Sequence, residues 1–552
     1  MPNAATLTPT AAPLLSATDL KAALDARDEI ALLDVRETGQ YARQHLLYAV
    51  SLPLWRIGWL VDRLVPRRDT RIVLTDLDGS LVQEAAARLA GLGYVDVSAL
   101  AGGTLAWAAA GYEVFSGTNV PSKAFGEVVE REAQTPHIDV RTLREKIQRG
   151  DKVVIVDGRT PQEFRNFSLP GAHSIPNAEL PYRVRELAPD PGTLVVVNCA
   201  GRTRSIIGAQ TLIDAGLPNP VAALQDGTMA WLLEGHALEH GRAPLQPEPS
   251  PAHLARARED AQALARRAGV VRIEARELAA FAADTTRTLY RFDVRSAEEY
   301  RAGHLPDWRW APGGQLVQAT DEYVGTRGAR VVLADWDGVR ALVTAAWLAQ
   351  LGLHEVFVFS PGPSADAELE TGDERVRILR EPGTPLAPWI GVRQAQELAD
   401  AGQARIFDID KNPLFARRHI AQAAFSAPDS LPRWLDALPG GTVAVITSTD
   451  GALAQLVASE LLRRGYDVRA LAGGSQAWFD AGLPTGSGRE AILTGEDDAR
   501  ADSYAYDDPA VRNRKFREYL DWEVGLLAQI ERPGGETPFR VAGRPGHAAP
   551  AR

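Results

Sequence analysis

The chain has 552 residues, of which 45% are hydrophobic and 24% charged, and this length exceeds what one hydrophobic core supports, so several domains are expected. A formal net charge of −11 argues against nucleic acid as a partner, because binding to phosphates requires clustered Lys and Arg side chains. The sequence has neither a basic, apolar leader nor a run of about 18 apolar residues, so we expect a cytoplasmic protein with no membrane partner.

A repeated unit begins with four short apolar runs that each end in an aspartate. The runs are IALLD, VVIVD, LYRFD and ARIFD, ending at Asp34, Asp157, Asp293 and Asp408. A second apolar run follows each, and then an amphipathic helix that closes at a capping glycine. These glycines are Gly93, Gly216, Gly352 and Gly465. Because apolar strands alternate with helices, the sequence predicts α/β domains, each a mostly parallel sheet flanked by helices.

Turn-rich and proline-rich segments separate the predicted domains. We place the four tandem domains at residues 14–118, 134–242, 268–372 and 387–487. The segments between them are FSGTNVPSKAF near residue 120, RAPLQPEPSPAH near 245 and LREPGTPLAPW near 383. A tail over residues 488–552 contains one predicted helix, VRNRKFREYLDWEVGLLAQIE, which we expect to dock on its own protein.

One loop position differs between the repeats. It lies 17 residues before each capping glycine and holds Asp76, Cys199, Asp335 and Ser448. Cys199 is the only cysteine, which excludes an internal disulfide and makes this thiol a candidate nucleophile. The other three domains are therefore predicted to be inactive. In two of them a carboxylate is expected to fill the anion-binding loop from within, because a helix N-terminus stabilises negative charge.

Other repeated aromatic and histidine side chains are predicted to be structural. A glycine turn opens a helix with a buried tryptophan in three units, at Trp107, Trp231 and Trp478, while the third unit departs from this motif. Histidines recur at His45, His304 and His419, where the second unit has Ser168. Because these histidines belong to units without a thiol, we interpret them as turn or core residues.

The loop that begins at Cys199 has the residue types of an anion-binding nucleophile site. Its members are Cys199, Ala200, Gly201, Arg202, Thr203, Arg204 and Ser205. The following helix N-terminus and the two arginines are expected to lower the thiol pKa from about 8.5. Backbone donors here form a nest for an anionic substrate or the outer sulfur of a persulfide, and Gly201 permits the tight turn.

With Asp157, Arg159, Glu163 and Phe164 upstream, this loop resembles the active site of the rhodanese family, and the resemblance covers four units to about residue 487. It implies that Cys199 takes sulfane sulfur from thiosulfate as a persulfide. The sulfur then passes to a thiophilic acceptor, such as cyanide or a sulfur-acceptor protein, without a cofactor or metal. Ala200 to Ser205 would bind substrate, with Arg202 and Arg204 as candidates for orienting the sulfonate, and which of the two contacts the substrate is left open.

The upstream residues are interpreted differently. Asp157, Arg159 and Glu163 are expected to support the first turn through ion pairs rather than to touch substrate, because the Asp and Arg recur in units that lack a thiol.

Three other functions remain open. A cysteine phosphatase would need an arginine at the position of Ser205, since its loop places five residues between Cys and Arg. A mercaptopyruvate sulfurtransferase would have a small, hydroxyl-rich loop instead of two arginines. A persulfide carrier or scaffold, loaded by a partner protein, would use the three inactive domains as a docking platform.

Overall fold

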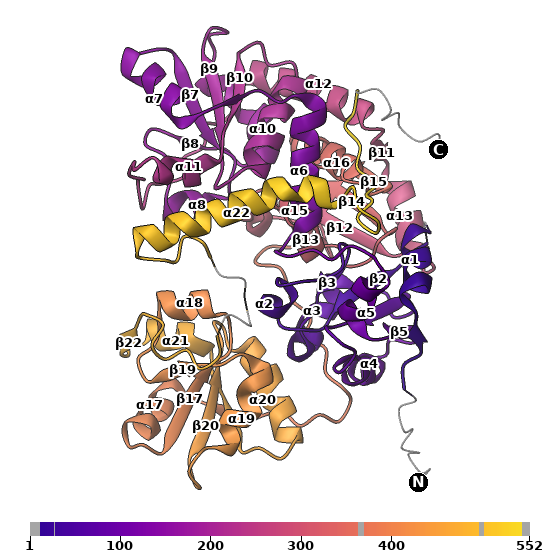
Figure 1. Ribbon diagram of the computed structural model, residues 1–552, viewed down its shortest axis with the longest axis vertical. Helices are drawn as coiled ribbons and strands as arrows, with labels where there is room; N and C mark the ends of the chain where they lie inside the picture. The colour runs from indigo at the N-terminus through magenta and orange to yellow at the C-terminus, as the bar shows by residue number, and fades with distance from the viewer. Residues whose placement is uncertain (1–10, 27, 363–368, 496–498, 500–501, 544–552) are drawn as a thin grey trace. The chain divides into compact units, whose positions relative to one another are not determined.

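The computed structural model describes residues 11–26, 28–362, 369–495, 499 and 502–543. Four α/β domains group into two compact units, Met1–Thr118 with Val376–Ala505 and Asn119–Arg375 with Tyr506–Arg552. Each domain contains one five-stranded parallel sheet flanked by helices, as the sequence predicts (Figure 1). Within the described residues, no helix is both long and apolar enough to cross a membrane.

The first domain belongs to the first unit. In spatial order its strands are β1 (Leu14–Leu15), β5 (Val97–Leu100), β4 (Ile72–Thr75), β2 (Ala31–Asp34) and β3 (Val50–Ser51). Its helices are α1 (Ala17–Asp25), α2 (Thr38–Tyr41), α3 (Ile57–Leu64), α4 (Val82–Gly91) and α5 (Gly103–Ala109).

The fourth domain completes this unit, and the two domains share one cluster of buried apolar side chains. Its strands are β16 (Trp389–Ile390), β21 (Val468–Leu471), β20 (Val443–Thr447), β17 (Ala404–Asp408) and β19 (Ala423–Phe425). An antiparallel pair, β18 (His419–Ile420) and β22 (Thr485–Gly486), is added. The helices are α17 (Val392–Asp400), α18 (Asn412–Arg417), α19 (Leu431–Asp436), α20 (Ala452–Arg463) and α21 (Gly474–Asp480).

The second domain contains the cysteine and belongs to the second unit. Its strands are β6 (His137–Ile138), β10 (Val221–Leu224), β9 (Leu194–Asn198), β7 (Val153–Asp157) and β8 (His173–Ser174). Its helices are α7 (Val140–Arg149), α8 (Pro161–Asn166), α9 (Leu180–Leu187), α10 (Thr203–Asp214) and α11 (Gly227–Leu233). The parallel register places Asn198, the residue before the cysteine, opposite Asp157.

The third domain has the same strand order. Its strands are β11 (Val271–Ile273), β15 (Glu355–Phe359), β14 (Arg330–Ala334), β12 (Leu289–Asp293) and β13 (Arg309–Trp310). Its helices are α13 (Ala275–Ala283), α14 (Ala297–Ala302), α15 (Gly313–Gln318) and α16 (Arg340–Gln350). Residues 363–368, in the segment where the sequence departs from the tryptophan motif, lie outside the described residues.

Three further helices belong to the second unit: α6 (Val120–Ala133), α12 (Pro251–Arg267) and α22 (Pro509–Gln529). The last confirms the predicted tail helix. The predicted linker around residue 120 contains a helix that the turn-rich sequence does not reveal, because Asn119 and Pro121 stand at the start of α6. The proline-rich segment near residue 245 likewise leads into a helix: Ser250 caps α12, and Pro251 occupies its first turn.

The repeated residues occupy the positions that the sequence predicts. Asp76, Cys199, Asp335 and Ser448 each directly follow the central strand of their sheet, β4, β9, β14 or β20. The four capping glycines have positive φ values, 90°, 71°, 107° and 96°. Each of the three tryptophans is buried and donates its indole N–H to a backbone carbonyl. Each of the three histidines stacks on an aromatic ring, with centroids 3.8–3.9 Å apart, which confirms their structural role.

Gly227 shows how closely α11 approaches the cysteine loop. Its φ is +54°, and a Cβ there would lie 2.3 Å from the carbonyl oxygen of Cys199. Gly235 also has a positive φ, +81°, but a Cβ there would have no neighbour within 4 Å.

We predict that Gly227→Ala lowers the free energy of unfolding by about 2–4 kcal/mol, which combines left-handed strain with a steric clash. Gly235→Ala, the matched control, should cost only about 1 kcal/mol because it adds strain alone. Urea denaturation followed by circular dichroism measures both, and equal losses would contradict the close approach.

Candidate active site

Cys199 lies at the end of β9, in the turn that leads into α10. Its side chain is buried, with 2% of its surface exposed. The backbone carbonyls of Cys199 and Ala200 accept hydrogen bonds from the backbone N–H groups of Thr228 and Met229, at 2.9 and 3.1 Å. The loop is therefore held between the start of α10 and the start of α11.

Ser205 is the loop residue that stabilises the thiolate most directly. Its backbone N–H hydrogen-bonds toward Cys199 and lowers the pKa of the thiol. The hydroxyl donates its one proton to the carbonyl of Arg202 at 2.7 Å, which closes the turn. Ser205 thus serves the loop's shape and the cysteine's charge together.

Burial nevertheless raises the pKa of Cys199 above its ordinary value. The charge of Arg204 and the backbone hydrogen bond from Ser205 act in the opposite direction, while the carboxylate of Glu523 adds to the increase. The sequence-based prediction of a lowered pKa is therefore wrong for this conformation. The reason is that desolvation, which a sequence motif does not reveal, outweighs the nearby positive charge.

Arg204 forms a two-pronged ion pair with Glu163. The nitrogen–oxygen distances are 2.8 and 2.7 Å. Burial opposes the charge of Glu163, but Arg204 prevails and holds the pKa of that carboxyl at about 2. The guanidinium is thus positioned beside the thiol by α8, and its charge favours the thiolate.

Arg202 points toward α6 instead. It binds Glu127 with two hydrogen bonds of 2.8 Å, Asp226 with one of 3.0 Å, and Glu130 with a further short contact. Its side chain is 10% exposed. Three carboxylates therefore bind the guanidinium of Arg202, which the sequence indicates as a candidate for substrate binding.

The predicted support of the first turn is present. Asp157 and Arg159 form a buried pair with contacts of 2.8–3.2 Å, and Asn198 donates to the same carboxylate at 3.1 Å. Glu163 closes the capping box of α8 with Thr160. This network connects β7 to Asn198, the last residue of β9, and so fixes the backbone directly before Cys199.

The carboxylates around the loop include several that sequence reasoning missed. They come from α6, from the turn before α11 and from α22, and they are Glu127, Glu130, Asp226 and Glu523. Glu523 accepts a short hydrogen bond from the hydroxyl of Thr203, 320 residues earlier in the chain. Glu127, Glu130 and Glu523 lie outside the predicted second domain, and Asp226 belongs to the glycine turn of the tryptophan motif, which the sequence indicates as structural only.

The third domain shows what the loop becomes without a cysteine. The carboxylate of Asp335 accepts backbone N–H bonds from Gly338 and Ala341 at 2.8 and 2.7 Å. Burial, together with the charge of Asp337, raises the pKa of Asp335 to about 7. Asp76 in the first domain accepts in the same way from Gly79 and Leu81. The prediction that a carboxylate fills these loops from within is confirmed.

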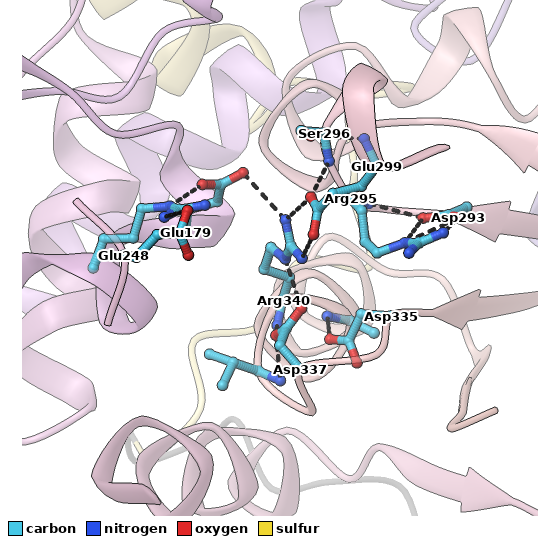
Figure 2. A network of polar contacts seen from close by, with 12 residues as sticks. Glu179, Glu248, Asp293, Arg295, Ser296, Glu299, Asp335, Asp337 and Arg340 are labelled. Atoms are coloured by element: carbon cyan, nitrogen blue, oxygen red, sulfur yellow. Dashed lines mark hydrogen bonds and ion pairs between the residues drawn. The ribbon is translucent and has the colours of Figure 1, made fainter. Parts of the chain in front are cut away.

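Figure 2 shows that the third domain also keeps the arginine–glutamate pair. Arg340 lies five residues after Asp335, as Arg204 does after Cys199, and it binds Glu299 at 2.6 and 2.7 Å. Arg340 also pairs with Asp337 and contacts Glu179 of the second domain at 3.5 Å. A pair that persists without a nucleophile has a structural role in addition to any chemical one.

Comparisons with known proteins agree with this architecture. The sequence profile of the rhodanese-like domain matches residues 16–110, 139–234, 274–365 and 392–481. A crystal structure of a thiosulfate sulfurtransferase from Pseudomonas aeruginosa is 43% identical, with a TM-score of 0.88, and the match covers 96% of this chain and all of that one. A sulfurtransferase of Allochromatium vinosum is 31% identical over 98 residues, 18% of this chain and 89% of that protein. The chain belongs to the rhodanese family of sulfurtransferases, as a tandem array of four rhodanese-like domains.

Proposed function

We propose that the chain transfers sulfane sulfur from thiosulfate to a thiophilic acceptor through a persulfide on Cys199. The thiolate attacks the outer sulfur of thiosulfate, so that a sulfur–sulfur bond forms to Cys199 and sulfite leaves with the electron pair of the broken bond. An acceptor such as cyanide then attacks the outer sulfur of the persulfide. Thiocyanate is released and the thiolate is regenerated.

The observation that carries this proposal is the placement of the only thiol of the chain. The residue that follows the central strand is an aspartate or a serine in the other three domains, and in the second domain it is Cys199. Support also comes from the similarity over 96% of the chain to a protein described as a thiosulfate sulfurtransferase. The backbone of Ala200 to Ser205 would receive the donor and the outer sulfur of the persulfide.

In this scheme Arg204 stabilises negative charge at Cys199. Its guanidinium lowers the pKa of Cys199 and is oriented by Glu163. It would stabilise the thiolate and then the dianionic donor that approaches it. Arg202, bound by Glu127, Glu130 and Asp226, would instead anchor the loop to α6.

A persulfide carrier loaded by a partner protein is the second candidate. The burial of Cys199 and the pairing of both loop arginines with carboxylates favour it, because they leave little positive charge for a small free dianion. Turnover of thiosulfate and cyanide by the purified chain alone separates the two functions, since a carrier would need its donor protein. Intact mass spectrometry after thiosulfate treatment would detect the one extra sulfur of the persulfide.

Replacing the nucleophile provides the first test. We predict that Cys199→Ser abolishes sulfur transfer and leaves thermal unfolding nearly unchanged, because a hydroxyl cannot form a persulfide and the exchange is small. Thiocyanate formation measures the effect. Activity above roughly a tenth of the wild-type rate would contradict a single persulfide site, since tenfold is only about 1.4 kcal/mol.

Removing the charge beside the thiol provides the second. Arg204→Ala should reduce the rate of persulfide formation from thiosulfate at least roughly tenfold, the loss expected for one charge-assisted contact. Release of sulfur to cyanide should slow less, because cyanide is not a dianion.

Arg340→Ala is the matched control, because it breaks the equivalent ion pair in a domain without a nucleophile. It should lower stability and leave both half-reactions unchanged. Single-turnover kinetics resolve the two steps, and an equal effect of Arg204→Ala on both would argue against a role in donor binding.

A third test asks whether a thiol is sufficient. We predict that Asp76→Cys in a Cys199→Ser background restores no thiosulfate-dependent thiocyanate formation. The first domain has Gly79 and Leu81 where the second has Arg202 and Arg204, and its loop adds the exposed carboxylate of Asp78. Appreciable turnover by the double variant would show that the charges of the loop matter less than its backbone.

A further inference from the structure

Helix α22 lies directly on the cysteine loop. Within the second unit it packs against α6 and α11, the two helices that border the loop (Figure 1). A Cβ at Gly201 would lie 3.2 Å from Cε1 of Tyr519 and 3.3 Å from Oε2 of Glu523. The absence of a side chain at Gly201 therefore lets α22 bring Glu523 against the backbone of the loop.

Glu523 is buried in this position, with 1% of its surface exposed. One carboxylate oxygen accepts a hydrogen bond from the hydroxyl of Thr203. The other, Oε2, has no hydrogen-bond partner in the part of the chain that the structure describes. A carboxyl group that is shielded from water and has only one of its oxygens hydrogen-bonded is costly, so its presence beside a nucleophile calls for a functional explanation.

The charge of Glu523 is not offset by either arginine of the loop. Arg202 binds Glu127, Glu130 and Asp226, and Arg204 binds Glu163. The carboxylate of Glu523 acts electrostatically on Cys199 and on Glu127, and it disfavours the negative form of both. An anion that approaches the thiol thus meets a negative charge that the loop does not neutralise.

We propose that Glu523 is a specificity-determining residue, whose carboxylate on α22 slows the reaction of anionic reagents at the Cys199 loop more than that of neutral ones. In the first and third domains a carboxylate of the loop itself closes the anion site permanently. In the second domain the carboxylate belongs to a separate helix, so it restricts the site without filling it. If the proposed function holds, this charge would weaken the binding of dianionic thiosulfate more than that of a neutral donor.

Two alkylating reagents of similar size test the charge selectivity without any turnover. Iodoacetate is an anion and iodoacetamide is neutral, and both react with the same thiolate, the only thiol in the chain. Their rate ratio therefore cancels changes in the pKa or exposure of Cys199. We expect Glu523→Gln, which keeps the shape and the contact with Thr203, to raise the ratio of iodoacetate to iodoacetamide rates roughly fivefold by removing one nearby charge.

Asp521→Asn is the matched control, because it removes the same charge from an exposed position on the same helix. It should leave the ratio unchanged. Glu523→Met repeats the measurement with an uncharged side chain of similar length if the glutamine variant unfolds. An unchanged ratio in the folded Glu523 variants, or an equal increase in Asp521→Asn, would overturn the proposal. A proportional increase in both rates would also overturn it, since it would show only that α22 covers the thiol.

The same variant links the charge to the proposed donor. Glu523→Gln should lower the KM for thiosulfate by roughly 25-fold, the square of the effect on iodoacetate, because a dianion interacts with the lost charge twice as strongly as a monoanion. A protein that alkylates with the expected change in ratio but never turns over thiosulfate would refute the proposed donor and support the role of Glu523. The failure of one proposal is thus distinguishable from the failure of the other.

Discussion

The backbone N–H groups at the start of the helix after each central strand need an acceptor while they are shielded from water. In the first and third domains an aspartate at the end of the strand supplies it, and in the fourth the hydroxyl of Ser448 accepts from Ala454 at 3.1 Å. In the second domain the same place belongs to Cys199, which accepts from Ser205. The same set of backbone donors is therefore met by an oxygen acceptor in three loops and by a thiol in one, within a common fold.

Ion pairs around this loop serve the architecture first. The aspartate–arginine pair at the first turn occurs in three domains, at Asp34, Asp157 and Asp293. The Arg204–Glu163 pair has its counterpart in Arg340–Glu299, where no thiol is present. Buried ion pairs of this kind fix the positions of the loops they join. They add little to the free energy of unfolding, because the cost of desolvating both charges offsets their attraction. The ion-pair framework of the second domain is thus also present in a domain that has no thiol.

The sequence predicts the repeats, the sheet type and the position of Cys199 because strand and helix periodicity and capping glycines are local signals. It also predicts the filling of the loop by Asp76 and Asp335, since a carboxylate at a helix N-terminus follows from short-range electrostatics. It misses α6, whose start looks like a turn, and the carboxylates that α6 and α22 bring to the loop. The raised pKa of Cys199 was unpredictable for the same reason: burial is a property of the assembled unit.

The contact between Thr203 and Glu523 spans 320 residues of sequence, and the whole of the fourth domain is synthesised in between. At translation rates of about 5–20 residues per second, roughly 16–64 s separate the two residues. The cysteine domain can complete its own sheet within that interval, with the loop still uncovered. A nascent chain in this state exposes a thiol that has no second cysteine to react with. The single-cysteine composition thus prevents incorrect intramolecular disulfides during the period when the site is least protected.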